Sequence, residues 1–525
     1  MDCSEVIAGI KNRFPDFSAL SVTQAYADEI YLKVSPQFFK DACLALHKAF
    51  SSPVEMLFAS DELKDAGKFV VNCVFVNLKK SQWVTVSMDI PQDAAYFDSL
   101  SKSIYSASLF EREIWEMFGL EPRGNPDLRR LRLHDEVWPK GNYPLRKDFQ
   151  KMQAGDLSDY KFNRVEGDGV FEIPVGPVHA GIIGPGHFRF SVAGEPIINL
   201  ETRLGFTHRG VEKLFEGKSC LEMIRLSECV SGDTSFGHSL AFAQAVEKIS
   251  GISIPKQATY LRAIFLELER LYNHVNDIGG MAVDVGFSFP SAYGSVIKEA
   301  ILQLNDSLTA SRYLKKVNTV GGVLKDLDES KKHILLDSLK SINMDFNELV
   351  KILYSSVSFM DRIDTTGALR RKTAEGIGVV GLIARASGLC ADLRGSFPGV
   401  YKEARFKITT EESGDVLARL KVRIAEFKES SRLIEFFTGK LIEGQEISSY
   451  AKIKQGSALG YAEGWRGPVL YWLETDAAGL IQRCKIVDSS FLNWQGLSYA
   501  VLGNIIPDFP LVNKSFDLSY SGGDL

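Results

Sequence analysis

The sequence contains few cysteines, and no two of them have the spacing of a metal-binding pair. Because zinc and iron–sulfur sites are usually built on cysteines only a few residues apart, this scatter predicts that the chain alone holds no metal. Cysteines this dispersed in a long chain are typical of a reducing compartment, where they pack as small apolar side chains. The seven cysteines of the 525 residues stand at positions 3, 43, 73, 220, 229, 390 and 484.

The chain also lacks an excess of positive charge. Its 61 Lys and Arg residues are outnumbered by 66 Asp and Glu residues, which gives a net charge of −5 at pH 7. Nucleic-acid-binding proteins usually show the opposite balance, so no nucleic-acid partner is expected.

Long hydrophobic runs are absent as well. The N-terminal segment MDCSEVIAGIKNRFPDF has early acidic residues and no apolar core of signal-peptide length. The most apolar helical run, GIGVVGLIARASGLCADL at 376–393, is interrupted by Arg385 and is too short to cross a bilayer. We therefore expect a chain that does not span the membrane but can dock on a protein that does.

Residues 1–150 predict an α+β domain, and the polar, aperiodic residues 151–168 predict a linker. Strands rich in β-branched and aromatic residues alternate here with amphipathic helices. The expected elements are a helix over 5–14, a hairpin of strands at 69–78 and 83–88, and a helix over 107–120 that ends at Gly119.

Residues 169–525 predict a mainly α-helical domain with small β-hairpins. Apolar residues recur there with the period of core-facing helices, so we expect a helical bundle with β additions. HFRFSVAGEPIINLE at 187–201 and GPVLYWLETDAAGLIQRCKIV at 467–487 alternate around turns and predict hairpins. The expected helical segments lie near 238–249, 260–275, 296–315, 331–354, 368–389 and 415–438.

A charged segment at 110–149 combines four prolines after Gly119 with many arginines and several aromatic residues. It is either a solvated charged loop or a rigid docking arm. We favour the docking arm, because prolines limit the backbone conformations of a loop, and a loop without a binding role seldom carries so many of them.

Two histidines, His179 and His187, stand among glycine–proline turns in GPVHAGIIGPGHFRF at 176–190. A histidine at such a junction is often only hydrogen-bonded structure, whereas two of them beside glycines also fit the wall of a site. The residues leave these alternatives equally open.

ETRLGFTHRGVEKLFEG at 201–217 places charged residues at helical spacing. Glu201, His208 and Glu212 would share one helix face, with Arg209 and Lys213 on the adjacent one. Such a face can move protons or hold a charged headgroup, and it can equally be a surface ladder of ion pairs.

Three further groups of polar residues are candidates for a site or for structural contacts. Asp233 and Thr234, next to Ser231, precede a long helix, where an ordinary N-cap is the favoured interpretation and an anion-binding helix start the alternative. Arg466 stands between glycines before a strand, where it can approach a ligand closely. Asp392 and Arg394 are expected to form a structural ion pair.

Taken together, these motifs resemble a known family. Residues 110–149, with ERE…FG…PDLRR and W…PLRKDF, resemble the 30-kDa-type subunit of respiratory complex I. Residues 171–525 resemble its 49-kDa-type subunit and the large subunit of energy-converting nickel–iron hydrogenases, through GPVH…GHF, HRGVEKL, AVEK, GLIARASGLCADLR, EGWRG and a terminal D…D. This order in one chain looks like the fused subunit of formate-hydrogenlyase-type complexes and of some bacterial complex I.

The resemblance implies two CxxC pairs that hold nickel and iron in the hydrogenases, and this sequence departs from both. Counted from the family motifs, the four thiolate positions fall on Ser231, Thr234, Ser519 and Gly522. Hydroxyls ionise far above neutral pH and do not replace thiolates on low-valent nickel. The expectation is therefore a nickel-free cradle, here defined as these four positions.

In complex I, the resemblance further implies, the same region holds a quinone headgroup between a hairpin histidine and a tyrosine. His179 and His187 occupy the hairpin here, but the tyrosine position falls near Gly232. Asp233, Thr234 and Tyr520 are the expected substitutes.

The function expected from this resemblance is that of a peripheral subunit in a membrane-bound, redox-driven proton or sodium pump. A small iron–sulfur partner with a [4Fe–4S] cluster and antiporter-type membrane subunits would complete the complex, at the cytoplasmic face of a prokaryotic inner membrane. The acceptor would be a quinone or a similar molecule. Two alternatives remain open: an NADH:quinone oxidoreductase subunit working as in complex I, and a structural scaffold with a non-catalytic cavity.

Overall fold

The computed structural model describes residue 5, residues 8–9 and the ranges 21–179, 183–442 and 452–525. The helix expected over 5–14 lies almost entirely outside these residues. In the described part of the chain, no helix is both long and apolar enough to cross a bilayer.

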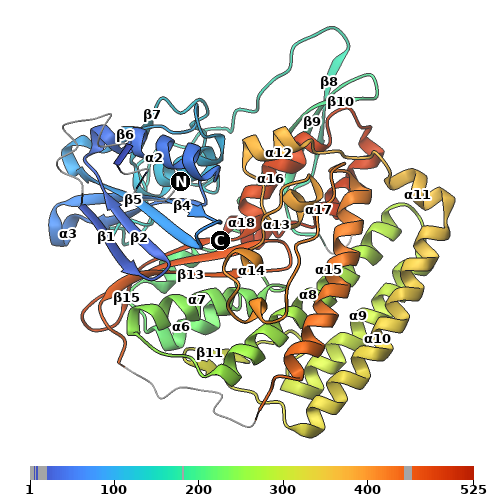
Figure 1. Cartoon of the computed structure of the whole chain (residues 1–525). Coiled ribbons are helices and arrows are strands. Elements are labelled where there is room, and N and C mark those ends of the chain that lie inside the picture. Colours follow the sequence, from blue (N-terminus) through green and yellow to red (C-terminus); the bar gives the residue numbers. More distant parts are fainter. Residues whose placement is uncertain (1–4, 6–7, 10–20, 180–182, 443–451) are drawn as a thin grey trace.

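The N-terminal part is built on a five-stranded sheet with the order β1-β2-β5-β4-β3, in which only β2 and β5 run parallel (Figure 1). The expected hairpin is confirmed as β4 and β5. Gly119 ends α4 with a φ of 71°, and a Cβ there would lie 2.5 Å from the Tyr143 ring. The elements are β1 (Ser21–Tyr26), β2 (Glu29–Lys33), α2 (Pro36–Phe50), β3 (Met56–Glu62), α3 (Leu63–Ala66), β4 (Lys68–Asn77), β5 (Gln82–Pro91), β6 (Tyr96–Asp98), α4 (Ser108–Phe118) and β7 (Glu121–Arg123).

The C-terminal part is a helical bundle around α8 (Lys256–Asp284), which is buried along most of its length. Helix α9 packs closely on α8, because a Cβ on Gly279 would already lie 3.4 Å from the carbonyl oxygen of Ser291. The other helices are α5 (Val211–Phe215), α6 (Cys220–Ser227), α7 (Ser235–Ser250), α9 (Ser288–Thr309), α10 (Glu329–Ser355), α11 (Val357–Ile363), α12 (Arg371–Ile377), α13 (Gly381–Ala386), α14 (Leu393–Ser396), α15 (Val416–Thr438), α16 (Ser489–Ala500), α17 (Phe509–Phe516) and α18 (Tyr520–Asp524).

Three small sheets accompany the bundle, and one of them joins the two halves of the molecule (Figure 1). Trp472 of β14 packs against Phe58 of β3 with ring centroids 4.7 Å apart, and Leu459 and Leu470 share the N-terminal hydrophobic core. The N-terminal part is therefore seated on this sheet. The strands are β8 (Val170–Val175), β9 (His187–Ala193) and β10 (Ile197–Arg203); β11 (Asn318–Thr319) and β12 (Gly322–Val323); and β13 (Gly456–Glu463), β14 (Pro468–Thr475) and β15 (Ile481–Val487).

Buried charges also connect the two halves. Lys485 of β15 makes ion pairs with Glu113 of α4 and, at 3.0 Å, with Glu212 of α5. Residues 152–166 run between the halves without regular secondary structure. The division of the chain into 1–150, 151–168 and 169–525 stays a prediction.

Two expected helices are wrong. Residues 201–203 belong to β10, and positive φ angles at Gly205 and Gly210 leave only the short α5 in the segment 201–217. The segment 368–389 forms α12 and α13, which are separated at Gly378, whose φ is 76°.

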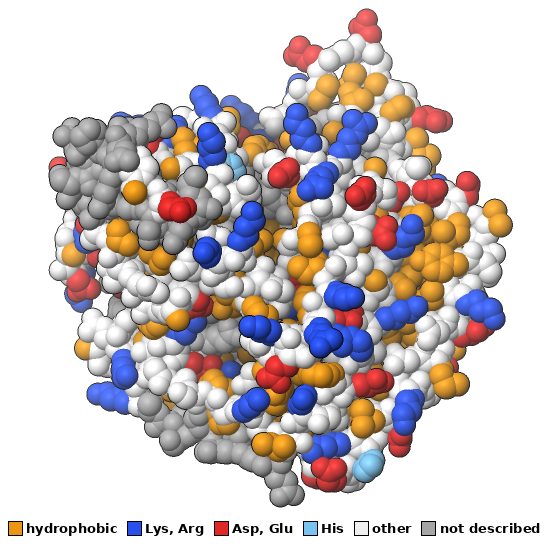
Figure 2. Space-filling view, in the orientation of Figure 1, with side chains coloured by type: hydrophobic (Ala, Val, Ile, Leu, Met, Phe, Trp, Pro, Cys, Tyr) orange, Lys and Arg blue, Asp and Glu red, His pale blue; other side chains and the backbone are white. Residues whose placement is uncertain are grey.

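The surface agrees with the balanced composition. On the face shown in Figure 2, acidic and basic side chains lie side by side instead of gathering in one basic patch. This pattern does not resemble a nucleic-acid-binding face.

Candidate functional site

The two ends of the cradle meet in the fold. Ser231, before α7, and Ser519, before α18, are 288 residues apart, yet their hydroxyl oxygens lie 2.8 Å from each other. Both residues are buried. The Ser519 hydroxyl also caps α18 by accepting from the backbone N–H of Gly522 at 2.9 Å. The predicted correspondence between the two distant motifs therefore holds in space.

Asp233 and Arg466 form a two-pronged ion pair beside this hydrogen bond. The Arg466 Nη1 and Nη2 groups donate to Asp233 Oδ1 at 2.8 Å and Oδ2 at 2.7 Å. Burial would raise the pKa of Asp233, but the guanidinium holds it below its ordinary value. The Ser231 hydroxyl donates to the same carboxylate at 2.8 Å, and Thr234 does so at 3.1 Å. Arg466 thus fixes the polar side chains of the cradle.

Gly522 has no side chain, and the space that a Cβ would fill is taken by Asp488. A Cβ built on Gly522 would lie 2.7 Å from the Asp488 carboxyl carbon. The Nε2–H of His238 donates to Asp488 at 3.0 Å, and His238 Nδ1 accepts from the Tyr471 hydroxyl at 3.0 Å. Burial would raise the pKa of Asp488, but the bond from His238 lowers it to about 2. A carboxylate therefore stands at the fourth corner of the cradle.

Thr234 occupies the N-cap position before α7, as expected, but the side chain that caps the helix comes from another residue. The Thr234 side chain makes no capping bond. The carboxylate of Glu269, on α8, instead accepts from the backbone N–H groups of Phe236 at 2.7 Å and Gly237 at 3.0 Å. Burial raises the pKa of Glu269 to about 8.

A second buried carboxyl, Asp277, adjoins the cradle through Asp517. Asp277 Oδ2 accepts from Arg423 Nε at 2.9 Å, whereas Oδ1 has no donor among the described hydrogen-bonding groups. Burial and the neighbouring Asp517 carboxylate raise the pKa of Asp277 well above its ordinary value, while Lys514 and Arg466 hold that of Asp517 low in spite of its burial. Two neighbouring carboxyls resist ionising together, so the raised pKa of Asp277 favours its protonated form beside the Asp517 carboxylate.

The histidine hairpin lies against the last helix. A Cβ built on Gly184 or Gly186 would overlap the Tyr520 ring, so these glycines let the β8–β9 connection pack directly on α18. His179 Nε2 binds the carbonyl oxygen of Gly186 at 2.7 Å. Gly186 therefore links the two side chains: its carbonyl oxygen binds His179, and its Cα packs against the Tyr520 ring.

His187 has a different environment from that of His179. Its ring packs on Phe162 of the linker, and its Nδ1 lies 3.3 Å from the carbonyl oxygen of Gly176. Burial lowers its pKa, and its buried Nε2 has no partner among the described residues. The His187 ring thus lies against the linker, with its Nε2 buried and unpaired among the described residues.

The three acid–base candidates at 201–217 are not on one helix face. Glu201 accepts from Tyr160 at 2.9 Å and also binds Arg129, so it holds the linker. His208 Nδ1 binds the carbonyl oxygen of Asp524 at 2.8 Å. Glu212 is buried among the interdomain cations. Of the three, the structure brings only His208 to the C-terminal turn.

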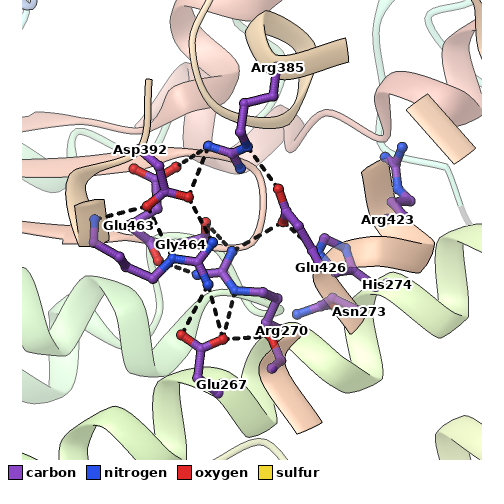
Figure 3. Close-up of polar contacts among 12 residues, drawn as sticks. Glu267, Arg270, Asn273, His274, Arg385, Asp392, Arg423, Glu426, Glu463 and Gly464 are labelled. Atoms are coloured by element: carbon purple, nitrogen blue, oxygen red, sulfur yellow. Dashed lines mark hydrogen bonds and ion pairs between the residues drawn. The ribbon is translucent and has the colours of Figure 1, made fainter. Parts of the chain in front are cut away.

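The helical part of the chain contains a buried network of charged side chains (Figure 3). The sequence predicted only one of its ion pairs. Asp392 and Arg394 are 2.7 Å apart, which confirms that pair. Arg385 lies between Glu426 at 2.7 Å and Glu463 at 2.8 Å, as Figure 3 shows. Charged letters within otherwise apolar helices, as in FLELERLYNHV, were the available signal for such a network.

Comparison with known proteins agrees with this architecture. Residues 32–154 match the family model of the respiratory-chain NADH dehydrogenase 30 Kd subunit, and residues 284–458 match that of the 49 Kd subunit. Formate hydrogenlyase subunit 5 of Escherichia coli (strain K12) is 31% identical over 528 residues, which cover 99% of this chain and 92% of that protein. The chain belongs to the fused 30-kDa/49-kDa family of complex I and hydrogenase subunits.

Other relatives are named either as hydrogenase components or as NADH-quinone oxidoreductase subunits. Hydrogenase-4 component G of Escherichia coli (strain K12) is 30% identical, with the same coverage of 99% and 92%. An NADH-quinone oxidoreductase subunit of Clostridium beijerinckii is 30% identical over 346 residues, 65% of this chain and 94% of that protein. The family therefore includes both hydrogenase and NADH-quinone oxidoreductase subunits.

Proposed function

We propose that the chain is the peripheral-arm subunit of a membrane-bound, complex-I-related oxidoreductase that drives a proton or sodium pump. Family membership supports the assignment to such a complex. In this proposal a small iron–sulfur subunit brings a [4Fe–4S] cluster to the cradle, and antiporter-type membrane subunits move the ion. The subunit sits at the cytoplasmic face of a prokaryotic inner membrane.

The observation that carries the nickel-free part of the proposal is the hydrogen bond between Ser231 and Ser519. A nickel–iron centre needs four soft thiolates, and these positions offer two serines, Thr234 and Gly522. The hydroxyls are already engaged with each other and with Asp233. The donor set does not fit nickel, so we propose that this subunit is not a hydrogenase.

Electron acceptance at the cradle is the function that its polar groups support best. We propose that the hairpin meets the headgroup of a quinone-like acceptor: His179 and the glycines packed on Tyr520 lie at its cradle end, and His187 Nε2 has no partner among the described residues. Ser231, Asp233, Thr234, Ser519 and Arg466 would border the inner end. Asp277 holds a proton next to this end, whereas Glu201 and Glu212 are tied to cations elsewhere, so we propose Asp277 and Asp517 as the proton-holding pair.

The proposal is tested on the purified complex. Metal analysis should find iron without stoichiometric nickel, and hydrogen should not reduce a viologen dye. Quinone-dependent oxidation should fall at least about tenfold in His187→Ala, because a hydrogen bond to the headgroup is lost. Stoichiometric nickel, or unchanged quinone activity, would contradict the corresponding half of the proposal. Activity with NADH as donor would instead favour the complex-I-like alternative.

One observation favours the scaffold alternative. Four cavities in the described part of the chain have walls that include none of His179, Thr234 and Arg466. In the isolated chain the cradle is closed by its own hydrogen bonds. If the complex assembles fully with Arg466→Met and keeps all its redox and pumping activity, the subunit acts as a scaffold.

A further inference from the structure

A cavity of about 530 Å³ lies between the N-terminal and C-terminal parts of the chain. One wall comes from the segment after α2 and from β5, and the other from α12, α13 and the following loop. Apolar side chains form most of both walls: Phe50, Val76, Leu78, Trp83, Ile104, Val380, Leu389, Leu393 and Pro468. A volume of this size suits a small organic molecule.

One acid in the cavity, Glu55, has no counter-charge. Its side chain is 7% exposed, and its one described hydrogen bond is a long one, 3.4 Å from the Ser52 hydroxyl. No lysine, arginine or histidine among the described residues pairs with it. A carboxyl that is buried without a cation is costly unless a ligand or a proton compensates it.

The other two interior acids are already compensated. Glu463 accepts from Arg385 Nη1 at 2.8 Å, and Asp392 pairs with Arg394 at 2.7 Å. Figure 3 shows both acids turned toward the buried charge network. The interior of the cavity therefore has one unmatched negative charge, at Glu55.

An unmatched donor borders the same space. Trp83 lines the cavity, is 1% exposed, and its Nε1–H has no partner among the described residues. An acid without a counter-charge and a donor without a hydrogen-bond partner, at the wall of one apolar cavity, are typical of a ligand site.

We propose that this interdomain cavity binds a small organic cation, an ammonium group carried on an apolar body. The ammonium group meets Glu55, and the apolar body fills the space between the two parts of the chain. None of the four cradle positions lines this cavity, and the proposal does not rest on the redox function proposed for the cradle.

Cation binding to this cavity should depend on pH through Glu55 and the charged groups around it. Burial raises the pKa of Glu55 to about 7, with Ser52 lowering it and Glu463 raising it. Cation binding needs the ionised form, so affinity should rise as the pH increases from 6 to 8. His47, Lys48, Arg371 and Glu375 stand at the mouth of the cavity. Burial also raises the pKa of Glu463, another residue of the cavity wall, to about 7, so the Glu55 contribution has to be isolated by substitution.

The probes are phenethylammonium, neutral 2-phenylethanol and anionic phenylacetate, titrated into the full chain by calorimetry. Phenethylammonium should bind one site, and Glu55→Gln should weaken it about tenfold or more, because a charge-assisted bond is lost. Glu121→Gln, an exposed acid outside the cavity, is the matched control. Ser103→Trp, which fills the mouth from an exposed position, should abolish binding even if Glu55→Gln fails to fold.

Two exposed cysteines locate the site. Cys390 lines the cavity and Cys229 does not. Bound phenethylammonium should slow maleimide alkylation of Cys390 and leave Cys229 unchanged, as read by peptide mass spectrometry. Equal binding of 2-phenylethanol, undiminished binding in Glu55→Gln, or equal protection of both cysteines would overturn the proposal. Because none of these readouts uses redox activity, they are separate from the test of the proposed function.

Discussion

Replacement of Asp277 by Asn tests whether a proton is shared beside the cradle. The amide keeps the shape of the side chain, accepts from Arg423 and offers an N–H to Asp517. At low pH, where both the folded and the unfolded protein hold the Asp277 proton, the variant should therefore be nearly as stable as the parent protein. The difference should emerge only as the pH rises.

The sign follows from linkage. The pKa of Asp277 is raised in the folded state, so the native protein holds a proton that the unfolded chain has released above about pH 4. Stability therefore falls as the pH rises toward the native pKa, by at most about 1.4 kcal/mol per pH unit for one proton. Asp517 stays ionised throughout the range, because Lys514 and Arg466 hold its pKa low in spite of its burial.

The assay is denaturant unfolding of the full chain at pH 5, 6, 7 and 8. Other buried acids, including Glu269 and Glu55, titrate in the same range, so the informative quantity is the difference in slope between the parent protein and Asp277→Asn. Asp337→Asn, an acid 74% exposed on α10, is the control and should leave the slope unchanged. Parallel slopes for the parent protein and Asp277→Asn would refute the shared proton.

Two further substitutions test the packing that positions the site. Gly522→Ala should destabilise the protein by about 1–3 kcal/mol, because its Cβ would overlap the Asp488 carboxylate, and circular dichroism melts measure the loss. Lys485→Met should cost about 3–5 kcal/mol, since Glu113 and Glu212 would be left buried without their shared cation. A loss below about 1 kcal/mol in Lys485→Met, measured by urea unfolding, would show that this cation does not hold the two halves together.

Local patterns predicted the hairpins and the long helices because each of these is decided within a few neighbouring residues. Strand β13 was missed, since GSALGYAE lacks the β-branched residues that usually mark a strand. Its small residues have a tertiary cause: α7 lies directly on the strand, and a Cβ on Gly460 would overlap the carbonyl oxygen of Ala241. No window of sequence contains that information.

The error at 201–217 has a related origin. Charges at helical spacing fit a helix, but they do not require one, and pairing with β9 takes Glu201 into a strand. Gly205 and Gly210 were visible in the sequence as possible breaks. Their positive φ angles decided the outcome.

The cradle itself was predictable because its four positions could be counted from recognisable motifs. Its supporting acids were not. Glu269, Asp277 and Asp488 look in the sequence like exposed helix or loop acids, and only the fold shows that each is buried beside the cradle. Glu269 accepts hydrogen bonds from the first turn of α7, and the nearer donor in space, Phe236, is 33 residues away in the sequence. Such a contact cannot be read from a local pattern.

The arrangement of these acids bears on where an electron acceptor can bind. Ser231, Ser519, Asp233 and Arg466 satisfy one another, so an acceptor entering between them would have to replace an ion pair and at least two hydrogen bonds. Binding against the unpartnered Nε2 of His187, whose ring lies on Phe162 of the linker, would require no such loss. Under the proposed function, a charge that reaches the cradle would act on the pair of Asp233 and Arg466, and through Arg466 on Asp517. The proposal therefore treats the cradle as a fixed set of charges beside an acceptor and not as a metal site.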